Sequence, residues 1–298
     1  MSTHSSDTAL STSTVPQITG IDERRAGYDA LIARKLPADV RTKASVLGTR
    51  PALELIPETV QDEQERLLYL HGGAFIMGST AGYEGFTAQF ARRAAIRTVS
   101  LDYRLAPEHP FPAAVEDGLA AYQDLLNRGT PPDKIVLAGD SAGGNLVLAT
   151  LLAARRAGLP IPAAAVLMSP VTDVAMTGAS MQSKKGVDPI FTPEALAEPF
   201  AAYLAGADPR SELASPLFAD LRGLPELLIQ VGAHELLLDD STRLAAQAAA
   251  ADVTVTLEVL AQAPHVFQIN YESSAAADAA LDRIARFIRR VLSQTLTN

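Results

Sequence analysis

The chain has 298 residues, of which 48% are hydrophobic and 20% charged, with no cysteine, no tryptophan and five histidines. This composition fits one large folded domain, or one and a half, and excludes a disordered chain. Without cysteine, a disulfide framework, a thiolate metal site, an iron–sulfur cluster and a cysteine nucleophile are all excluded. The net charge of −9 repels phosphate backbones and acidic lipids, so we expect neither a nucleic-acid partner nor a membrane-surface partner.

The first twenty residues are rich in serine and threonine and have no basic or apolar region. We therefore expect a flexible leader over residues 1–20 and not a secretory signal. The sequence contains no run of about 18 apolar residues, so we expect no membrane span and a cytoplasmic location.

Short apolar segments alternate with helical patterns along the rest of the chain. The pattern predicts a first helix from Asp22 that ends before Pro37, and a last amphipathic helix with apolar residues from Leu281 to Leu292. Between them it predicts strands over 67–70, 98–101, 135–138, 165–168, 227–231 and 253–260, and helices over 80–95, 113–127, 142–157 and 241–251. This alternation predicts an α/β fold with a mostly parallel sheet covered by helices on both faces.

One segment interrupts the alternation. The stretch from Val171 to Pro216 separates two predicted strands by far more than a crossover needs, and it contains a helical pattern over residues 195–204. We interpret it as an insertion that packs with the N-terminal helix as a lid over one end of the sheet.

The strongest local signal is the sequence G-D-S-A-G at residues 139–143, which lies between a predicted strand and an alanine-rich helix. A sharp strand-to-helix turn strains the backbone of its middle residue, and flanking glycines remove the Cβ atoms that would clash there. The positive end of the helix then lies beneath that residue. In this context the motif predicts that Ser141 is a catalytic nucleophile.

A second glycine motif, His71-Gly72-Gly73, also follows a predicted strand. Glycines let backbone N–H groups face a cleft without a side chain in the way, as the oxyanion hole of acyl transfer requires. Alone, the motif would be an ordinary turn. Beside a nucleophile turn, it predicts an oxyanion hole formed by the N–H groups of Gly72, Gly73 and Ala142.

The nucleophile needs a base, because a hydroxyl is a poor nucleophile at neutral pH. His4 lies in the leader, His71 belongs to the glycine motif, and His109 lies in a proline-rich turn. His234 follows a strand but precedes the expected position of the acid. His265 follows the final strand through a short loop, in the chain order nucleophile, acid, base, so we expect it to be the base.

The acid should follow the strand over residues 227–231, where Glu235, Asp239 and Asp240 are available. The two aspartates precede an alanine-rich helix, where a carboxylate commonly acts as a cap. Glu235 comes first after the strand and is our candidate for the residue that orients His265. Asp173, after the preceding strand, is a more distant alternative.

Taken together, four segments resemble the hormone-sensitive lipase family of α/β-hydrolases, and more narrowly its bacterial carboxylesterases. They are H-G-G-A-F at 71–75, D-Y-R-L-A-P-E-H-P-F-P-A at 102–113, G-D-S-A-G-G-N at 139–145 and P-H-V-F at 264–267. The resemblance implies an eight-stranded α/β-hydrolase core, a helical cap and hydrolysis of short-chain esters without a cofactor. Two positions differ from the usual pattern: Ala74 stands where many members have a third glycine, and Glu235 where many have aspartate.

From these patterns we expect a helical cap from residues 21–45 and 171–216, and a catalytic core from residues 46–170 and 217–298. A small-molecule ester would bind in an apolar pocket beneath the cap. The candidate pocket residues, each of which could equally be core, are Phe75, Met77, Phe191, Phe200, Leu204, Val266 and Phe267.

The sequence is also compatible with other functions. The same residues could hydrolyse amides, formamides or lactones, and a non-catalytic ligand-binding member of the fold is a further alternative. The sequence lacks the zinc-protease, P-loop and dinucleotide motifs, so we expect no metal and no nucleotide cofactor. The apolar stripe from Leu281 to Leu292 could form a homodimer contact or pack on the sheet.

Overall fold

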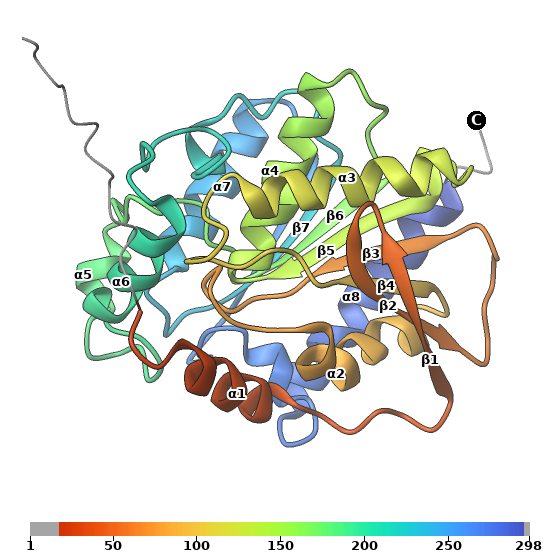
Figure 1. The fold of residues 1–298 in the computed structure, drawn as a ribbon, viewed down its shortest axis with the longest axis horizontal. Coiled ribbons are helices and arrows are strands. Elements are labelled where there is room, and N and C mark those ends of the chain that lie inside the picture. The colour runs from red at the N-terminus through yellow and green to blue at the C-terminus, as the bar shows by residue number, and fades with distance from the viewer. Residues whose placement is uncertain (1–17, 295–298) are drawn as a thin grey trace, which may run out of the picture.

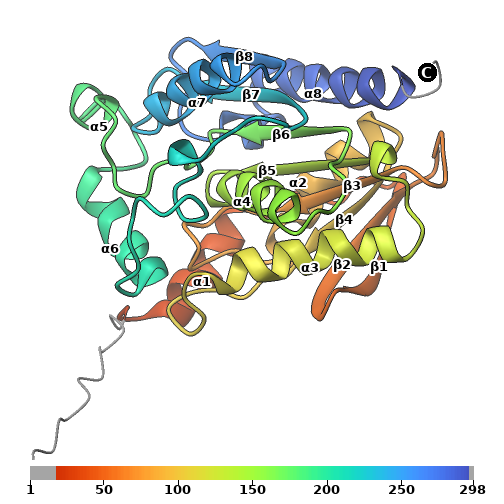
Figure 2. The ribbon, with the colours of Figure 1, turned by 90° about the horizontal axis from the view of Figure 1, so that it is seen from above.

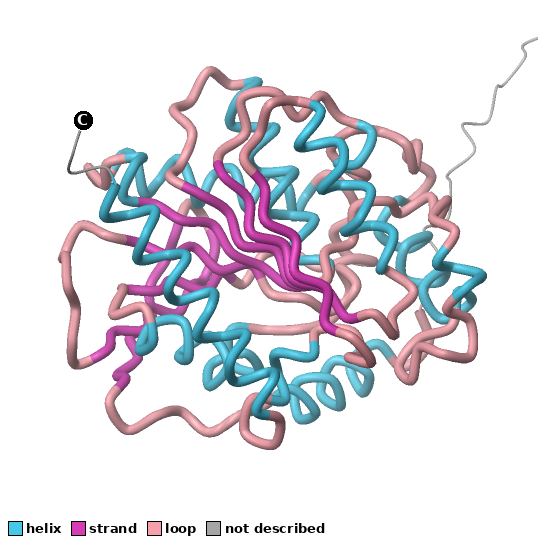
Figure 3. The backbone as a smooth tube through the Cα atoms, turned by 180° about the vertical axis from the view of Figure 1, so that it is seen from behind, coloured by secondary structure: helices cyan, strands magenta, loops and turns pink. Residues whose placement is uncertain are grey.

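A single twisted sheet of eight strands forms the centre of the computed structural model, which describes residues 18–294 (Figures 1 and 3). The strands are β1 (Val40–Leu47), β2 (Arg50–Pro57), β3 (Arg66–Leu70), β4 (Arg97–Leu101), β5 (Ile135–Asp140), β6 (Ala164–Met168), β7 (Glu226–Gly232) and β8 (Val255–Leu260). Their order across the sheet is β1-β2-β4-β3-β5-β6-β7-β8. β2 pairs antiparallel with β1 and β4, and the pairs from β4 to β8 are parallel.

Helices cover both faces of this sheet (Figure 2). They are α1 (Ile21–Ile32), α2 (Thr80–Arg93), α3 (Ala113–Asn127), α4 (Ala142–Arg156), α5 (Ser180–Ser183), α6 (Pro193–Leu204), α7 (Leu238–Ala250) and α8 (Ala275–Gln294). Three short 3-10 helices are η1 (Pro132–Lys134), η2 (Pro216–Phe218) and η3 (Phe267–Asn270).

The strands divide the core into two apolar layers, because successive side chains of a strand point to opposite faces. On β3, Leu68 and Leu70 join a large cluster with residues of α3, α4 and α7, whereas Leu67 and Tyr69 join a second cluster with residues of α2 and α8. Strands buried on both faces must be apolar throughout, which explains the short uninterrupted apolar runs in the sequence.

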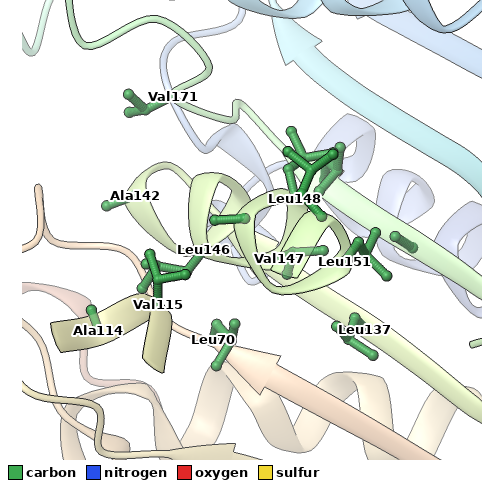
Figure 4. Packing of buried hydrophobic residues seen from close by; sticks show 14 of the residues in the cluster. Leu70, Ala114, Val115, Leu137, Ala142, Leu146, Val147, Leu148, Leu151 and Val171 are labelled. Carbon is green, nitrogen blue, oxygen red and sulfur yellow. The ribbon is translucent and has the colours of Figure 1, made fainter. Parts of the chain in front are cut away.

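Helix α4 is buried along nearly its whole length. Figure 4 shows Leu146 and Val147 of α4 packed among Val115 of α3 and the strand residues Leu70 and Leu137, all members of the larger cluster. A helix so enclosed has no polar face to present, which accounts for its alanine and leucine content. Its N-terminus is thereby held firmly at the end of β5.

The predicted strands from residue 67 onward and the predicted helices are confirmed, with boundaries that differ by a few residues. The β1–β2 hairpin was not predicted from the sequence. Strand β1 is exposed along much of its length and is buried mainly at Val40 and Leu47, so it has no continuous apolar run. Its partner β2 reaches the sheet by antiparallel pairing with β4.

Helices α1, α5 and α6 lie together at one end of the sheet (Figures 1 and 2). Arg24 of α1 forms an ion pair with Glu198 of α6 at 2.9 Å, so the two separated pieces of chain join. The expected cap boundary at residue 45 is wrong, because residues 40–45 belong to β1 of the sheet. The predicted leader lies outside the described residues up to position 17, and at its end Ile18 is buried in the larger cluster.

The apolar stripe of the last helix packs on the sheet: Leu281, Ile284, Ile288 and Leu292 are buried in the second cluster. Within residues 18–294, no helix is both long enough and apolar enough to cross a membrane.

The close packing of Gly143 against the backbone of Leu70 predicts that a side chain at this position lowers stability. A Cβ atom on Gly143 would lie 1.9 Å from the Leu70 carbonyl oxygen, so Gly143→Ala should lower the free energy of unfolding by about 2–3 kcal/mol or more. Gly27, inside α1, has nothing within 4 Å of the same position, so Gly27→Ala should raise it by about 0.5–1 kcal/mol. Urea denaturation measures both, and an equal stability of Gly143→Ala and the unmodified protein would contradict the steric argument.

Candidate active site

Ser141 occupies a strained turn between β5 and α4, with φ 52° and ψ −119°. A Cβ on Gly139 would lie 2.5 Å from the backbone of Gly143, and a Cβ on Gly143 would lie 1.9 Å from the Leu70 carbonyl oxygen. Both flanking positions therefore require glycine for steric reasons. The strain at Ser141 is a feature of turns that present a nucleophile.

The backbone of Ser141 is held by neighbouring segments. Its N–H donates to the Met168 carbonyl at the end of β6 (2.8 Å), and its carbonyl accepts from the N–H of Val171 (3.0 Å). The residue is only 8% exposed. These bonds fix the hydroxyl at the N-terminus of α4, where the helix dipole favours negative charge.

The expected base and acid are in direct contact. His265 Nδ1 lies 2.6 Å from Glu235 Oε2, and both side chains are buried. Because a carboxylate only accepts hydrogen bonds, Nδ1 is the donor and Nε2 is left to accept a proton. The other oxygen of Glu235 accepts from the Ser169 hydroxyl (2.8 Å) and from the N–H of Gly232 (2.6 Å). The carboxylate is thus held by three hydrogen bonds.

Charges around the imidazole alter its basicity. Burial by itself lowers the pKa of His265, but the charge and the hydrogen bond of Glu235 raise it, and Asp140 and Asp188 add to that effect. The net result is a pKa above the ordinary value for histidine. The charged, imidazolium form of His265 is therefore stabilised.

The end of β6 connects the turn at Ser141 to the loop that carries His265. Met168 accepts from the N–H of Ser141, and the adjacent Ser169 accepts through its hydroxyl from the N–H of Val266 (3.0 Å), next to His265. Among the described residues, no hydrogen bond links the Ser141 hydroxyl to the His265 ring. Such bonds are often long in ligand-free enzymes and shorten when substrate binds.

The alternative acids have other partners. Asp239 accepts from the N–H of Ser180 (2.9 Å), and Asp240 accepts from the N–H of Asp173 (2.9 Å). Burial raises the pKa of Asp240 to about 7. Asp173 itself forms an ion pair with Arg243 at 2.9 Å. These three aspartates hold the base of the cap, and within residues 18–294 none of them accepts a hydrogen bond from the His265 ring.

The N–H of Gly72 does not face the site as the sequence analysis expected. It donates to Asp140 Oδ1 (3.0 Å), and a Cβ on Gly72 would lie 2.2 Å from the other oxygen of that carboxylate. Asp140 is buried and also accepts from the hydroxyls of Tyr69 (2.7 Å) and Tyr83 (2.8 Å). The Gly72 proton is therefore used to hold the glycine loop in place.

The next residues of the loop have free N–H groups. Gly73 (φ 115°), Ala74 (φ 53°) and Phe75 (φ 66°) have successive positive φ angles. The N–H groups of Gly73, Ala74 and Ala142 donate to no other residue in the described part of the chain. Ala74 was missed as a candidate; its signal in the sequence is that its position commonly carries glycine, the residue that adopts positive φ most easily.

His71 supports this loop structurally. It is buried between Tyr103, whose ring centroid lies 4.3 Å away, and Tyr83, at 5.4 Å. Its Nδ1 lies 2.7 Å from the Gly72 carbonyl, and burial lowers its pKa. A neutral, stacked imidazole of this kind fixes the geometry of the turn.

Helix α1 holds the same loop from outside. The Arg25 guanidinium donates to the Ile76 carbonyl (2.9 Å) and forms an ion pair with Glu108 at 2.7 Å. The Tyr28 hydroxyl lies 2.8 Å from the Tyr83 hydroxyl, which in turn bonds the buried aspartate behind the glycine loop. The N-terminal piece of the cap thus helps to set the shape of the glycine loop.

The candidate pocket residues separate into two groups. Phe75 is buried and stacks on Tyr203 of α6 with ring centroids 3.8 Å apart, and Phe200 lies edge-on to Phe75 at 6.2 Å. Met77, Phe191 and Leu204 are partly buried against the same cluster. Phe191 also contacts the ring of His265, with ring centroids 5.1 Å apart.

The last two candidates, Val266 and Phe267, follow His265 in the chain. Val266 is buried with φ 46°. Phe267 packs in a separate cluster with Ala263, Ala277 and Ala280, so its assignment to the pocket is wrong. Phe267 begins η3 and packs there against Ala277 and Ala280 of α8. Within residues 18–294, no group of three or more histidines, aspartates or glutamates could hold a metal ion.

Comparison with known proteins agrees with this geometry. A family described as the alpha/beta hydrolase fold matches residues 67–269. The chain belongs to this family. An "Acetyl-hydrolase" of Streptomyces hygroscopicus is 43% identical over 230 residues, covering 77% of each chain. An "Esterase" of Acinetobacter venetianus is 38% identical over 225 residues, covering 74% of this chain and 73% of its own.

Solved structures give the same result. A crystal structure of an esterase from the bacterial hormone-sensitive lipase family is 42% identical and covers 93% of each chain with a TM-score of 0.89. EstE5, from a crystal soaked by p-nitrophenyl butyrate, is 40% identical and has the same TM-score, with 94% of this chain and 95% of its own covered. The resemblance to the hormone-sensitive lipase family is thereby confirmed.

Proposed function

We propose that this α/β-hydrolase is a serine carboxylesterase that hydrolyses short-chain esters of small molecules through an acyl-enzyme on Ser141. The observation that carries the proposal is the 2.6 Å hydrogen bond between His265 and Glu235, at the same end of the sheet as the strained serine. The names of relatives, which include an esterase and an acetyl-hydrolase, support an ester as substrate.

In the first step, the Ser141 hydroxyl attacks the ester carbonyl while His265 Nε2 takes its proton. Glu235 accepts a hydrogen bond from Nδ1 and so keeps a proton on that nitrogen. Nε2 is therefore free to accept the proton of the serine. The carbonyl π electrons move to its oxygen and a tetrahedral intermediate forms. This oxygen becomes negative and must be stabilised.

We assign the oxyanion hole to the N–H groups of Gly73, Ala74 and Ala142. Gly72 is replaced by Ala74 in this assignment, because the Gly72 proton is bonded to Asp140. Each such donor commonly contributes about 2.7–4 kcal/mol to transition-state stabilisation. As the first residue of α4, Ala142 also has an N–H without a partner in its own helix.

Collapse of the intermediate transfers the proton from His265 to the leaving alcohol and leaves an acyl ester on Ser141. A water molecule then donates a proton to His265 and attacks the acyl carbonyl. The second intermediate releases the carboxylic acid and returns the proton to the serine. The sequence of steps needs no cofactor.

A small acyl group fits the surroundings of the site best. The aromatic stack of Phe75, Phe200 and Tyr203 is buried and holds the cap against the core. Because these rings are already packed, they leave little room for a long chain between cap and sheet. We therefore propose esters with short acyl chains as substrates.

Replacement of the nucleophile tests the mechanism directly. Ser141→Ala should lower kcat for p-nitrophenyl butyrate by about 10⁴-fold or more, because the covalent step is lost. A fluorophosphonate probe should label the unmodified protein at Ser141 and leave the variant unlabelled, with circular dichroism as the control for folding. Undiminished turnover by the variant would contradict the proposal, and an unlabelled, inactive wild type would indicate a non-catalytic member of the fold.

The acid is tested by ranking three amide substitutions. Glu235→Gln should lower kcat about 10³- to 10⁴-fold, because His265 loses its orienting acceptor. Loss of this carboxylate also lowers the pKa of His265, so the acidic limb of the kcat/KM profile of any residual activity should move to lower pH. Asp239→Asn and Asp240→Asn should retain far more activity, and the reverse ranking would move the acid along the loop.

Substrate range is tested with a series of p-nitrophenyl esters. We expect kcat/KM to be highest for acetyl and butyryl esters and to fall as the acyl chain lengthens, because longer chains must displace packed rings. A rate that rises steadily beyond about ten carbons would contradict a compact acyl pocket.

A further inference from the structure

A buried carboxylate from the cap contacts the loop that carries the acid. Asp188 Oδ2 accepts a hydrogen bond from the N–H of Leu236 (2.8 Å), the residue directly after Glu235. Asp188 lies in the long insertion of the cap and is only 8% exposed. A carboxylate buried in this way needs donors, and one of those that it uses belongs to the active-site loop.

The carbonyl group of Leu236 is also held by the cap. It accepts a hydrogen bond from the hydroxyl of Ser180 in α5. The same hydroxyl accepts from the N–H of Asp239 (3.1 Å), and Asp239 accepts from the N–H of Ser180 (2.9 Å). Leu236, the residue directly after Glu235, therefore has both its N–H and its C=O group hydrogen-bonded to residues of the cap.

The turn that Asp188 closes also reaches the base. Its Oδ1 accepts from the N–H groups of Ile190 (2.8 Å) and Phe191 (3.0 Å). The Phe191 ring lies edge-on against the ring of His265, with an interplanar angle of 69°. The Asp188 carboxylate thus holds two groups in place. One is the backbone next to Glu235, and the other is the loop that carries the Phe191 ring against His265.

We propose that Asp188 and Ser180 are positioning residues of the cap, which hold the Leu236 peptide and thereby keep Glu235 aligned with His265. The proposal rests on the function proposed above. It assigns the cap a part in the chemical step in addition to shaping the pocket. The cap segment from Ser180 to Phe191 then stays on the acid loop during turnover, since lifting it would release Leu236.

Electrostatics support the same assignment. Three carboxylates act on His265 from three elements: Glu235 on the loop after β7, Asp140 at the end of β5, and Asp188 from the cap. All three raise the pKa of the imidazole, against the opposing effect of burial. Removal of the charge at Asp188 should therefore make His265 less basic.

A purely structural explanation is that Asp188 only closes its own Asp-Pro turn. The same cap contains a matched turn, Asp208-Pro209, in which Asp208 Oδ1 accepts from the N–H of Arg210 (2.9 Å). Asp208 is exposed, and no hydrogen bond joins it to the acid loop in the described part of the chain. Asp208→Asn therefore controls for the loss of a carboxylate in a cap turn.

The experiment compares Asp188→Asn with Asp208→Asn in the full-length protein, with p-nitrophenyl butyrate as substrate. Asp188→Asn should lower kcat about 10- to 100-fold, because the acid moves out of alignment, while KM changes by less than about threefold. The acidic limb of its kcat/KM profile should move to lower pH. Asp208→Asn should leave kcat and the pH profile unchanged, and thermal unfolding checks that both variants are folded.

Two results would overturn the proposal. One is an Asp188→Asn variant with the kcat and pH profile of the wild type; the other is a loss of kcat without any movement of the acidic limb, which a merely structural role would give. If that variant does not fold, Ser180→Ala decides, because it removes the bond to the Leu236 carbonyl without a change of charge. It should lower kcat and move the acidic limb to lower pH, because Glu235 is no longer held against His265. An unchanged kcat or an unmoved acidic limb would refute the proposal.

The activity of the wild-type protein distinguishes a failure of this inference from a failure of the proposed function. A wild-type protein that neither hydrolyses the ester nor reacts with a fluorophosphonate would contradict the function itself. An active wild type with an equally active Asp188→Asn variant would contradict only the role of the cap.

Discussion

The close approach of backbone segments at the end of β5 is the constraint on which the site depends. Gly143 lies so near the Leu70 carbonyl that any side chain there would collide with it. This contact joins the nucleophile turn to the end of β3, from which the glycine loop leaves. The strained conformation of Ser141 follows, because the chain must turn from strand to helix within a few residues. Enclosure of α4 in the larger apolar cluster stabilises the turn against this strain.

Buried carboxylates then connect the loops around this turn. Asp140 holds the glycine loop, Glu235 holds the His265 ring, Asp188 holds the chain after Glu235, and Asp240 holds the part of the cap that follows β6. Burial of a charged group is costly unless hydrogen bonds compensate for lost hydration, so each carboxylate constrains the N–H or O–H groups around it. This arrangement explains why loops that are far apart in sequence keep a defined geometry. It also joins the cap to the loop that carries Glu235, since Asp188 and Asp240 both form hydrogen bonds between cap and core.

Much of the fold could be predicted from short segments of the sequence. The strands that are buried on both faces are short apolar runs, and the turn at Ser141 has a sterically required sequence, so both were predictable. The β1–β2 hairpin was not, because an exposed edge strand has no continuous apolar run and pairs through backbone atoms that any sequence provides. Phe267 shows the same limit: its apolar character is visible in the sequence, but the cluster that it joins depends on the path of the last helix.

The amino-acid sequence by itself determined the α/β class, the order of its main elements, the nucleophile turn and the short set of candidate bases and acids. Only the tertiary structure decided which carboxylate meets His265 and which N–H groups are free beside Ser141. Glu235, Asp239 and Asp240 are close neighbours in the chain, and their different partners follow from the packing of the cap against α7. Likewise, the Gly72 and Gly73 N–H groups look equivalent until Asp140 is placed behind one of them. Local sequence specifies which chemical groups are available, whereas contacts between distant segments decide which of them are already hydrogen-bonded.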